Sequence, residues 1–484
     1  MNLATVSLKS SVPSPPYLGS PIPRLLLNSP ISYLSRSRWF SVFGGHNAGS
    51  VVSLYHLNHR RDSSCFCSFN NIYGYNDAVV KDFDIATLGN LCVDIVLGVP
   101  QLPPAAPEDR MSYMEQLSSC PPDKQFWEAG GNCNTAISAA RLGLHCAAIG
   151  HVGDEIYGQF LLDVLDTEGI AMIGMNEDGD KNGSEASYET LLCWVLVDPM
   201  QRHGFCSRAD FMKEPAFSWM TELSGDVKMA IRQSKILFCN GYGFDDLSPA
   251  LIMTAIDYAV EVGTSIFFDP GPRGKSLSRG SPEERQALDR FMQHSDVLLL
   301  TADEAKSLTG MDDPVLAGQT LLRQGTQTKW VVIKMGSKGS IIITKSTIAC
   351  APAFKVNIVD TVGCGDSFVA AIAFGFIHKF PLVSTLTIAN AVGAATAMGS
   401  GAGRNVATLD QVLKIIRAAD INEDEKFWTS LLRGKSDSYK IILLSKMAIS
   451  ERNCGSTLVS LQNVVPQLLP KLQPPSRIKD VVPS

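Results

Sequence analysis

The stretch DTVGCGDSF, residues 360–368, decides the fold expected for this chain. The residues before it, 354–359, predict a strand, and the apolar residues 368–377 predict a buried helix. Two glycines therefore stand where a helix begins, a place where free backbone N–H groups and the helix dipole attract anions. Glycine also lets the backbone bend freely and approach a ligand closely. The sequence thus predicts a phosphate-binding turn formed by Gly363, Cys364 and Gly365.

Asp366 adds a carboxylate to this anion site, where its charge would repel phosphate. One interpretation is that Asp366 merely caps the helix that begins here. The other is that it accepts the proton of a hydroxyl group that attacks a bound phosphate.

The pattern D-T-x-G-x-G-D-x-F between a strand and a buried helix resembles the C-terminal motif of the PfkB family of carbohydrate kinases, also called the ribokinase family. The resemblance implies that Asp366 is the catalytic base and that Gly363, Cys364 and Gly365 form the anion hole. Cys364 replaces the usual Ala with another small residue. The implied fold is α/β: a ribokinase-like three-layer α/β/α domain with a mostly parallel central sheet and a small β-strand lid.

Composition and length are those of a globular protein. The 484 residues are 45% apolar and 19% charged, and the net charge of −6 gives no basic surface for nucleic acid. Residues 381–403 are uncharged and long enough to cross a membrane, but they contain several Ser, Thr and Gly residues, so we expect no membrane span. The twelve dispersed cysteines favour a reducing compartment.

The N-terminus differs from the rest of the chain because no acidic residue precedes Asp62, while Ser, Pro and Arg are frequent. This composition is typical of organelle transit peptides. We expect a transit peptide over residues 1–75 that directs the protein to plastids; the alternatives are a mitochondrial signal and a disordered cytosolic extension. The kinase domain is expected over 82–420, with lid segments at about 95–128 and 188–212. Residues 421–484 form an extension without a motif.

Short apolar runs alternate with helical patterns, which predicts a parallel sheet covered on both faces. Residues 83–90 predict a first strand, which residues 91–96 continue. Further strands are expected at 190–197, 236–240, 265–269 and 296–300.

Asp94 lies alone among apolar neighbours, and a lone acid there is costly unless it is paired. It either faces water at a strand edge or accepts hydroxyl groups of a polyol; the resemblance implies sugar binding. Residues 129–134, AGGNCN, resemble the family's N-terminal substrate motif, which includes Gly130 and Gly131. Pairing Ala129 with Gly130 makes Asn134 the substrate-binding Asn. Pairing the two glycines leaves the spacer one residue short, and Asn132 remains a rival.

The nucleotide side of the site is expected near residues 330–344, which read as strand, glycine turn and strand. A plain hairpin explains this pattern, but the resemblance places Lys334, Gly336 and Gly339 against ATP. It also places Asn390 and Gly401 in the adenine pocket.

Two acidic residues are candidates for metal handling. Glu304 is either an ordinary first-turn helix residue or, by resemblance, positions Mg²⁺ through water; Thr301 stands where the family has Asn. Asp360 corresponds to the place where some family members bind a monovalent cation, which allows K⁺ dependence.

The sequence therefore predicts an ATP- and Mg²⁺-dependent kinase of a small sugar or nucleoside, without nucleic acid or membrane partners. A homodimer formed through the lid is compatible with the resemblance. The alternative function is a catalytically inactive, kinase-like scaffold in plastids.

Overall fold

The fold is seen in a computed structural model, which describes residues 80–104, 106–119, 122–175, 189–200, 202–212, 214–218, 220–436, 438–446 and 456–472. The expected transit peptide, residues 1–75, lies outside these ranges. Residues 76–484 form one compact unit, and the description that follows concerns the described part of it.

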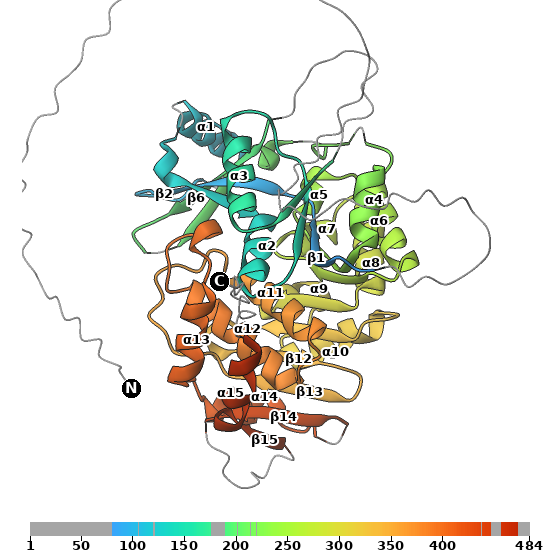
Figure 1. The fold of residues 1–484 in the computed structure, drawn as a ribbon, viewed down its shortest axis with the longest axis vertical. Coiled ribbons are helices and arrows are strands. Elements are labelled where there is room, and N and C mark those ends of the chain that lie inside the picture. Colours follow the sequence, from blue (N-terminus) through green and yellow to red (C-terminus); the bar gives the residue numbers. More distant parts are fainter. Residues whose placement is uncertain are drawn as a thin grey trace, which may run out of the picture. The chain divides into compact units, whose positions relative to one another are not determined.

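A large sheet of eleven strands forms the middle layer of this unit (Figure 1). Ten strands run parallel, and β12 alone is antiparallel to both of its neighbours. In order across the sheet the strands are β15 (Ser456–Ser460), β14 (Lys440–Ser445), β13 (Thr347–Ala351), β12 (Ser340–Ile343), β11 (Trp330–Lys334), β10 (Val297–Thr301), β9 (Ser265–Asp269), β8 (Ser234–Asn240), β1 (Phe83–Leu88), β4 (Cys146–Gly150) and β5 (Ala171–Gly174).

Successive residues of a strand point to opposite faces of the sheet. Both faces therefore carry apolar side chains, and helices cover both. Phe267 belongs to one hydrophobic core and Phe268 to the other. The first core packs under α2 (Asn132–Arg141), α3 (Ile156–Thr167), α11 (Cys364–Ile377), α12 (Leu382–Thr396), α13 (Leu409–Ala418) and α15 (Leu461–Leu468). The second packs under α4 (Gly225–Arg232), α6 (Pro249–Glu261), α8 (Pro282–His294), α9 (Ala302–Thr309), α10 (Pro314–Gln324) and α14 (Glu425–Leu432). Short helices α5 (Gly243–Asp246) and α7 (Arg273–Leu277) follow β8 and β9.

A second sheet of four strands forms the lid, in the order β3 (Trp127–Gly131), β2 (Leu91–Gly98), β6 (Leu191–Val197) and β7 (His203–Ser207). Helix α1 (Pro107–Ser118) lies in the connection between β2 and β3. The ribokinase-like three-layer fold with a small β lid is therefore confirmed. None of the helices among the described residues is both long and apolar enough to cross a membrane.

Two strand predictions were wrong. Residues 91–96 do not continue β1: the chain turns at Gly89, whose φ is +116°, and then enters the lid sheet as β2. Residues 354–359 form no strand, apart from one isolated bridge between Phe354 and Ile421. Two apolar side chains of the second segment face solvent and not a core, since Ile358 is 62% exposed and Val359 is 48% exposed.

The C-terminal extension is part of the same sheet. Strand β14 pairs in parallel with β13, and β15 pairs in parallel with β14. Trp428 on α14 is buried in the second core, and Leu461 on α15 is buried in the first. The described parts of residues 421–484 therefore extend both helical layers as well as the sheet.

Candidate active site

The site lies at the carboxyl ends of the parallel strands, where open α/β sheets bind their ligands. Five neighbouring strands β11, β10, β9, β8 and β1 end side by side there. Their last residues are Lys334, Thr301, Asp269, Asn240 and Leu88. This edge collects polar side chains from segments far apart in the sequence.

The predicted anion turn opens helix α11. Gly363 is left-handed, with φ +75°, and precedes the first helical residue, Cys364. A Cβ atom on Gly363 would lie 2.8 Å from the Cβ of Ala402, so glycine is required by both conformation and space. Gly365 is exposed, and a Cβ built on it would lie 3.7 Å from Nζ of Lys334. The first-turn N–H groups and an ammonium group thus meet at one place.

Asp366 occupies the first turn of α11 and is partly buried. Burial and the nearby carboxylate of Asp269 raise its pKa, whereas Lys334 and a hydrogen bond from the Asn134 side chain lower it; the resulting pKa is about 6. A carboxylate with this pKa is mostly ionised at neutral pH and still accepts a proton, as a general base must.

The geometry separates Asn134 from its rival Asn132. Asn134 hydrogen-bonds Asp366, and its Oδ1 accepts the N–H of Gly403 at 2.7 Å. The Asn132 side chain is fully buried; its Nδ2 donates to the carbonyl of Leu88 at 3.0 Å and its Oδ1 accepts from Asn240 at 2.7 Å. Asn132 therefore joins strands of the sheet, while Asn134 lies beside the candidate base.

Asp94 projects from lid strand β2 and is 6% exposed. Burial, helped by the charges of Asp366 and Glu128, raises its pKa, and a hydrogen bond from Cys92 lowers it; the resulting pKa is about 7. A side chain on Gly130 would overlap the Asp94 carboxylate. Gly131, with φ +58°, would bring a Cβ to 2.5 Å from the carbonyl oxygen of Asn90.

Both glycines of the predicted substrate motif stand at positions where a side chain would not fit. Gly130 leaves space for the carboxylate, and Gly131 allows the turn into α2.

Lys334 and Asp269 form an ion pair of 2.6 Å that the sequence reasoning missed. Burial disfavours the charged ammonium group, but Asp269, Glu304 and Asp366 outweigh it and raise the pKa of Lys334. Burial and Asp269 likewise raise the pKa of Glu304. One cation therefore faces three carboxylates. The sequence places Asp269 at the end of the strand predicted at 265–269 and gives no sign of its pairing with Lys334.

Glu304 also serves helix α9. Its carboxylate accepts the N–H of Thr301 at 2.7 Å, and Thr301 Oγ1 accepts the N–H of Glu304 at 3.2 Å. This capping box explains the Thr that stands in place of the family's Asn. In the described part of the chain, no group of three or more His, Cys, Asp or Glu side chains could hold a metal ion directly.

The expected hairpin is present, and its glycines are strained positions for other residues: φ is +54° at Gly336 and +106° at Gly339. Asn390 is 8% exposed; its Oδ1 accepts from Ser340 at 2.8 Å, and its Nδ2 donates to the carbonyl of Ala351 at 2.9 Å. Asn390 thus holds α12 against the sheet beside the hairpin. The nucleotide contacts assigned to these residues stay predictions.

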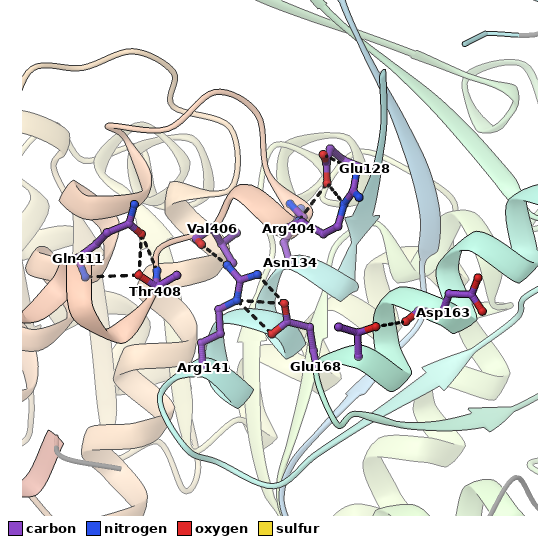
Figure 2. Close-up of polar contacts among 11 residues, drawn as sticks. Glu128, Asn134, Arg141, Asp163, Glu168, Arg404, Val406, Thr408 and Gln411 are labelled. Carbon is purple, nitrogen blue, oxygen red and sulfur yellow. Dashed lines mark hydrogen bonds and ion pairs between the residues drawn. The ribbon is translucent and has the colours of Figure 1, made fainter. Parts of the chain in front are cut away.

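Among the described residues, two side-chain pairs join the lid to the rest of the site, and neither had a sequence signal. Glu128 on β3 pairs with Arg404, accepting Nη2 at Oε1 and Nε at Oε2, each at 3.0 Å (Figure 2). At the opposite edge of the lid sheet, Nε2 of His203 on β7 lies 2.6 Å from Oδ1 of Asp360. The second oxygen of Asp360 accepts the N–H of Gly401 at 2.6 Å.

Comparison with known proteins agrees with this geometry. Residues 109–409, more than half of the chain, match the pfkB family of carbohydrate kinases. The chain is 27% identical over 302 residues to probable fructokinase-4 of Arabidopsis thaliana, covering 60% of this chain and 87% of that protein. It is 26% identical over 349 residues to the 5-dehydro-2-deoxygluconokinase of Geobacillus kaustophilus (strain HTA426), covering 69% and 94%.

A putative ribokinase II from E. coli, solved in complex with ATP and Mg²⁺, has the same fold, with a TM-score of 0.52 and 20% identity. The likeness covers 69% of this chain and 99% of that structure. A structure of Arabidopsis thaliana ribokinase matches the same share of this chain and is covered to 98%. The chain therefore belongs to the pfkB family of carbohydrate kinases and is a phosphotransferase that acts on an alcohol group.

Proposed function

We propose that this enzyme transfers the terminal phosphoryl group of ATP to a hydroxyl group of a small sugar, with Asp366 as the general base. The observation that carries the proposal is the position of Asp366, in the anion turn, beside Asn134, and with a pKa of about 6. A nucleoside is the alternative acceptor. The similarity to a probable fructokinase makes fructose the first candidate.

The acceptor would bind between the lid and the sheet edge. Asp94 is buried and has a raised pKa, so new hydrogen-bond donors would stabilise the charged form of its carboxylate. Sugar hydroxyl groups are such donors. With Asn134 beside Asp366, one hydroxyl group of the sugar would point at the base.

The anion turn would stabilise the negative charge of the moving phosphoryl group. Phosphoryl transfer depends on positioning and electrostatics more than on covalent chemistry of the protein. The first-turn N–H groups of α11 have no partner within the helix, and Lys334 adds a positive charge beside Gly365.

Mg²⁺ fits the donor set at this edge. Among the described residues, Asp269, Glu304 and Asp366 share the ammonium group of Lys334, so the cluster has excess negative charge. When bound with ATP, Mg²⁺ supplies positive charge to the phosphates. Glu304 would hold it through water, because among the described residues no group of three or more His, Cys, Asp or Glu side chains could hold the ion.

A panel of sugars and nucleosides with labelled ATP tests the proposal. We expect phosphorylation of one sugar or a few related ones, and at most weak transfer to nucleosides. Asp366→Asn is the matched control, because it keeps the shape and removes the proton acceptor. A panel with no product, or product formed equally well by the variant, would contradict the proposal.

We further propose import into plastids, on the basis of the acid-free N-terminus. A fluorescent fusion of residues 1–75 should accumulate in plastids. A control in which Arg36, Arg38, Arg60 and Arg61 become Glu should stay in the cytosol, because transit peptides are poor in acidic residues. A wild-type fusion found in the cytosol or in mitochondria would overturn this proposal.

A further inference from the structure

The hairpin loop between β11 and β12, residues 335–339, begins beside the anion turn. It follows directly on Lys334, whose Nζ lies 3.7 Å from the position of a Cβ built on Gly365. The loop ends at Ser340, whose hydroxyl group donates to Oδ1 of Asn390 at 2.8 Å. The hairpin loop therefore connects the phosphate end of the site to the residue that we expect in the adenine pocket.

The sequence of this hairpin loop gives it little rigidity of its own. Gly336 and Gly339 have φ angles of +54° and +106°, and glycine reaches such angles as readily as negative ones. Gly336 and Ser337 are exposed, so the tip of the loop is not packed into a core. Because glycine allows many backbone conformations, ordering this loop costs conformational entropy. Contacts from outside the loop are needed to favour the conformation seen here.

The C-terminal extension supplies such contacts. Nδ2 of Asn422 donates to the carbonyl of Ser337 at 2.8 Å. Oδ2 of Asp424 lies 2.6 Å from Nζ of Lys338, and the centroid of the Phe427 ring lies 5.3 Å from the same Nζ. An exposed ion pair contributes little alone, and the Lys338 and Asp424 side chains are 42% and 33% exposed. Here a hydrogen bond, an ion pair and a cation–π contact act on two consecutive loop residues, so together they restrict the loop.

The residues that hold the hairpin loop are themselves fixed to the main sheet. The N–H of Asn422 donates to the carbonyl of Ala353 at 2.7 Å. Oδ1 of Asp424 caps helix α14 by accepting the N–H of Phe427 at 3.0 Å. Trp428, which is 3% exposed, anchors this helix in the second core, and strand β14, which follows it, pairs with β13. The contacts on the loop therefore start from a rigid part of the fold.

We propose that residues 422–427 of the C-terminal extension hold the hairpin loop in the conformation that binds ATP, and so set the affinity of the enzyme for the nucleotide. The proposal rests on the kinase function proposed above and on the nucleotide contacts predicted for the hairpin. A loop that is ordered before ATP arrives loses less conformational entropy on binding. Asn422 and Asp424 are thus positioning residues, which act through the loop. Both lie outside residues 109–409, the part of the chain that matches the family.

A second ion pair of the extension offers a matched control. Nζ of Lys435 lies 2.5 Å from Oδ2 of Asp313 at the start of α10, so this pair also ties the extension to the kinase domain. It involves no residue of the hairpin loop. Lys435→Met removes the pair and leaves Oδ1 of Asp313 to cap α10 through the N–H of Val315. An effect that follows from a loosened extension alone should appear in this variant as well.

The experiment measures two quantities on the full chain without sugar: the hydrogen exchange of the backbone amides of residues 335–339, and the Kd for ATP with Mg²⁺ by calorimetry. Asn422→Ala removes the hydrogen bond to the loop. Asp424→Asn removes the charge that faces Lys338 and keeps the helix cap, since Asn is also a good N-cap residue. Each variant should exchange the loop amides faster and raise the Kd about two- to tenfold, and the double variant should raise it roughly five- to fiftyfold.

Lys435→Met should keep the wild-type Kd and the wild-type exchange of the loop. The kinetics should separate the two substrates. In the double variant the KM for ATP should rise with the Kd, whereas the KM for the sugar and kcat at saturating ATP should stay within about twofold of wild type. A general loss of structure would instead lower kcat as well.

An unchanged Kd for ATP in the double variant would overturn the proposal. So would loop amides that exchange as slowly as in wild type, or a Lys435→Met variant with the same rise in Kd. If the double variant fails to fold, the two single variants decide by the same measurements. A wild type that binds no ATP would overturn both this proposal and the kinase function. A wild type that binds ATP but phosphorylates no sugar of the panel would count against the kinase function alone, because exchange and binding need no sugar.

Discussion

Asp94→Asn should make the protein more stable and less active. Burial raises the pKa of Asp94 from 3.8 to about 7, so the folded protein binds the proton more tightly than the unfolded chain does. Above pH 7 the carboxylate is charged in both states, and the folded state then bears the full cost of the charge. At about 1.36 kcal/mol per pH unit between the two pKa values, this cost is at most roughly 4 kcal/mol.

The stability should depend on pH with a defined sign. A raised pKa of a carboxyl group stabilises the folded state below the unfolded pKa, and this contribution is lost as the pH rises through about 7. Because Asn is also buried there, we expect Asp94→Asn to raise the free energy of unfolding by about 1–3 kcal/mol at pH 8 and by much less at pH 5. Urea unfolding followed by tryptophan fluorescence measures both. The kcat/KM for the sugar should fall roughly ten- to a hundredfold, since a hydrogen bond to a charged acceptor is lost.

Asp84→Asn is the matched control with the opposite sign. Burial opposes ionisation of Asp84, but hydrogen bonds from Lys235 and from the N–H of His145 outweigh it and lower its pKa. This variant should therefore lose stability at pH 8. An Asp94→Asn variant that is no more stable than wild type at pH 8, or that gains equally at pH 5, would refute the reasoning.

Further predictions concern the surroundings of Asp366. Because Asp269 raises the pKa of Asp366 and Lys334 lowers it, Asp269→Asn should move the acid limb of the pH–kcat profile to lower pH and Lys334→Met to higher pH; equal shifts would contradict this. Gly363→Ala should destabilise the protein by about 1–3 kcal/mol and abolish most activity, measured by urea unfolding and phosphoryl transfer, because Gly363 is left-handed. Burial raises the pKa of Cys364 to about 12, so alkylating agents should inactivate Cys364→Ala as fast as wild type; resistance of the variant would show a reactive thiol.

The sequence predicts the regular parts of this fold well. The strand at 265–269 has the predicted bounds, and the strand at 330–334 begins where the strand, glycine turn and strand of 330–344 were expected to begin, because each is a compact apolar run followed by a polar or glycine turn. The run at 91–96 is equally apolar, yet it belongs to the lid. Its apolar residues pack in the lid sheet, and no local pattern tells a lid strand from a strand of the main sheet.

The candidate site was predictable where one segment carries it. The anion turn and Asp366 lie within a few consecutive residues, so local spacing alone places them. The pair of Lys334 with Asp269, and that of His203 with Asp360, join residues 65 and 157 positions apart in the chain. Only the tertiary arrangement of strands and loops brings such residues together, and that arrangement cannot be read from spacing.

The pH dependence of kcat in wild type and Asp366→Asn tests the central claim most directly. We predict that wild-type kcat rises with pH to a plateau, with a midpoint near the pKa of about 6 set by burial and Asp269. The variant should lose about 10²- to 10⁴-fold in kcat and lose the limb at pH 6, while its affinity for ATP stays close to that of wild type. A variant that keeps more than about a tenth of the turnover, or the same acid limb, would show that Asp366 is not the base.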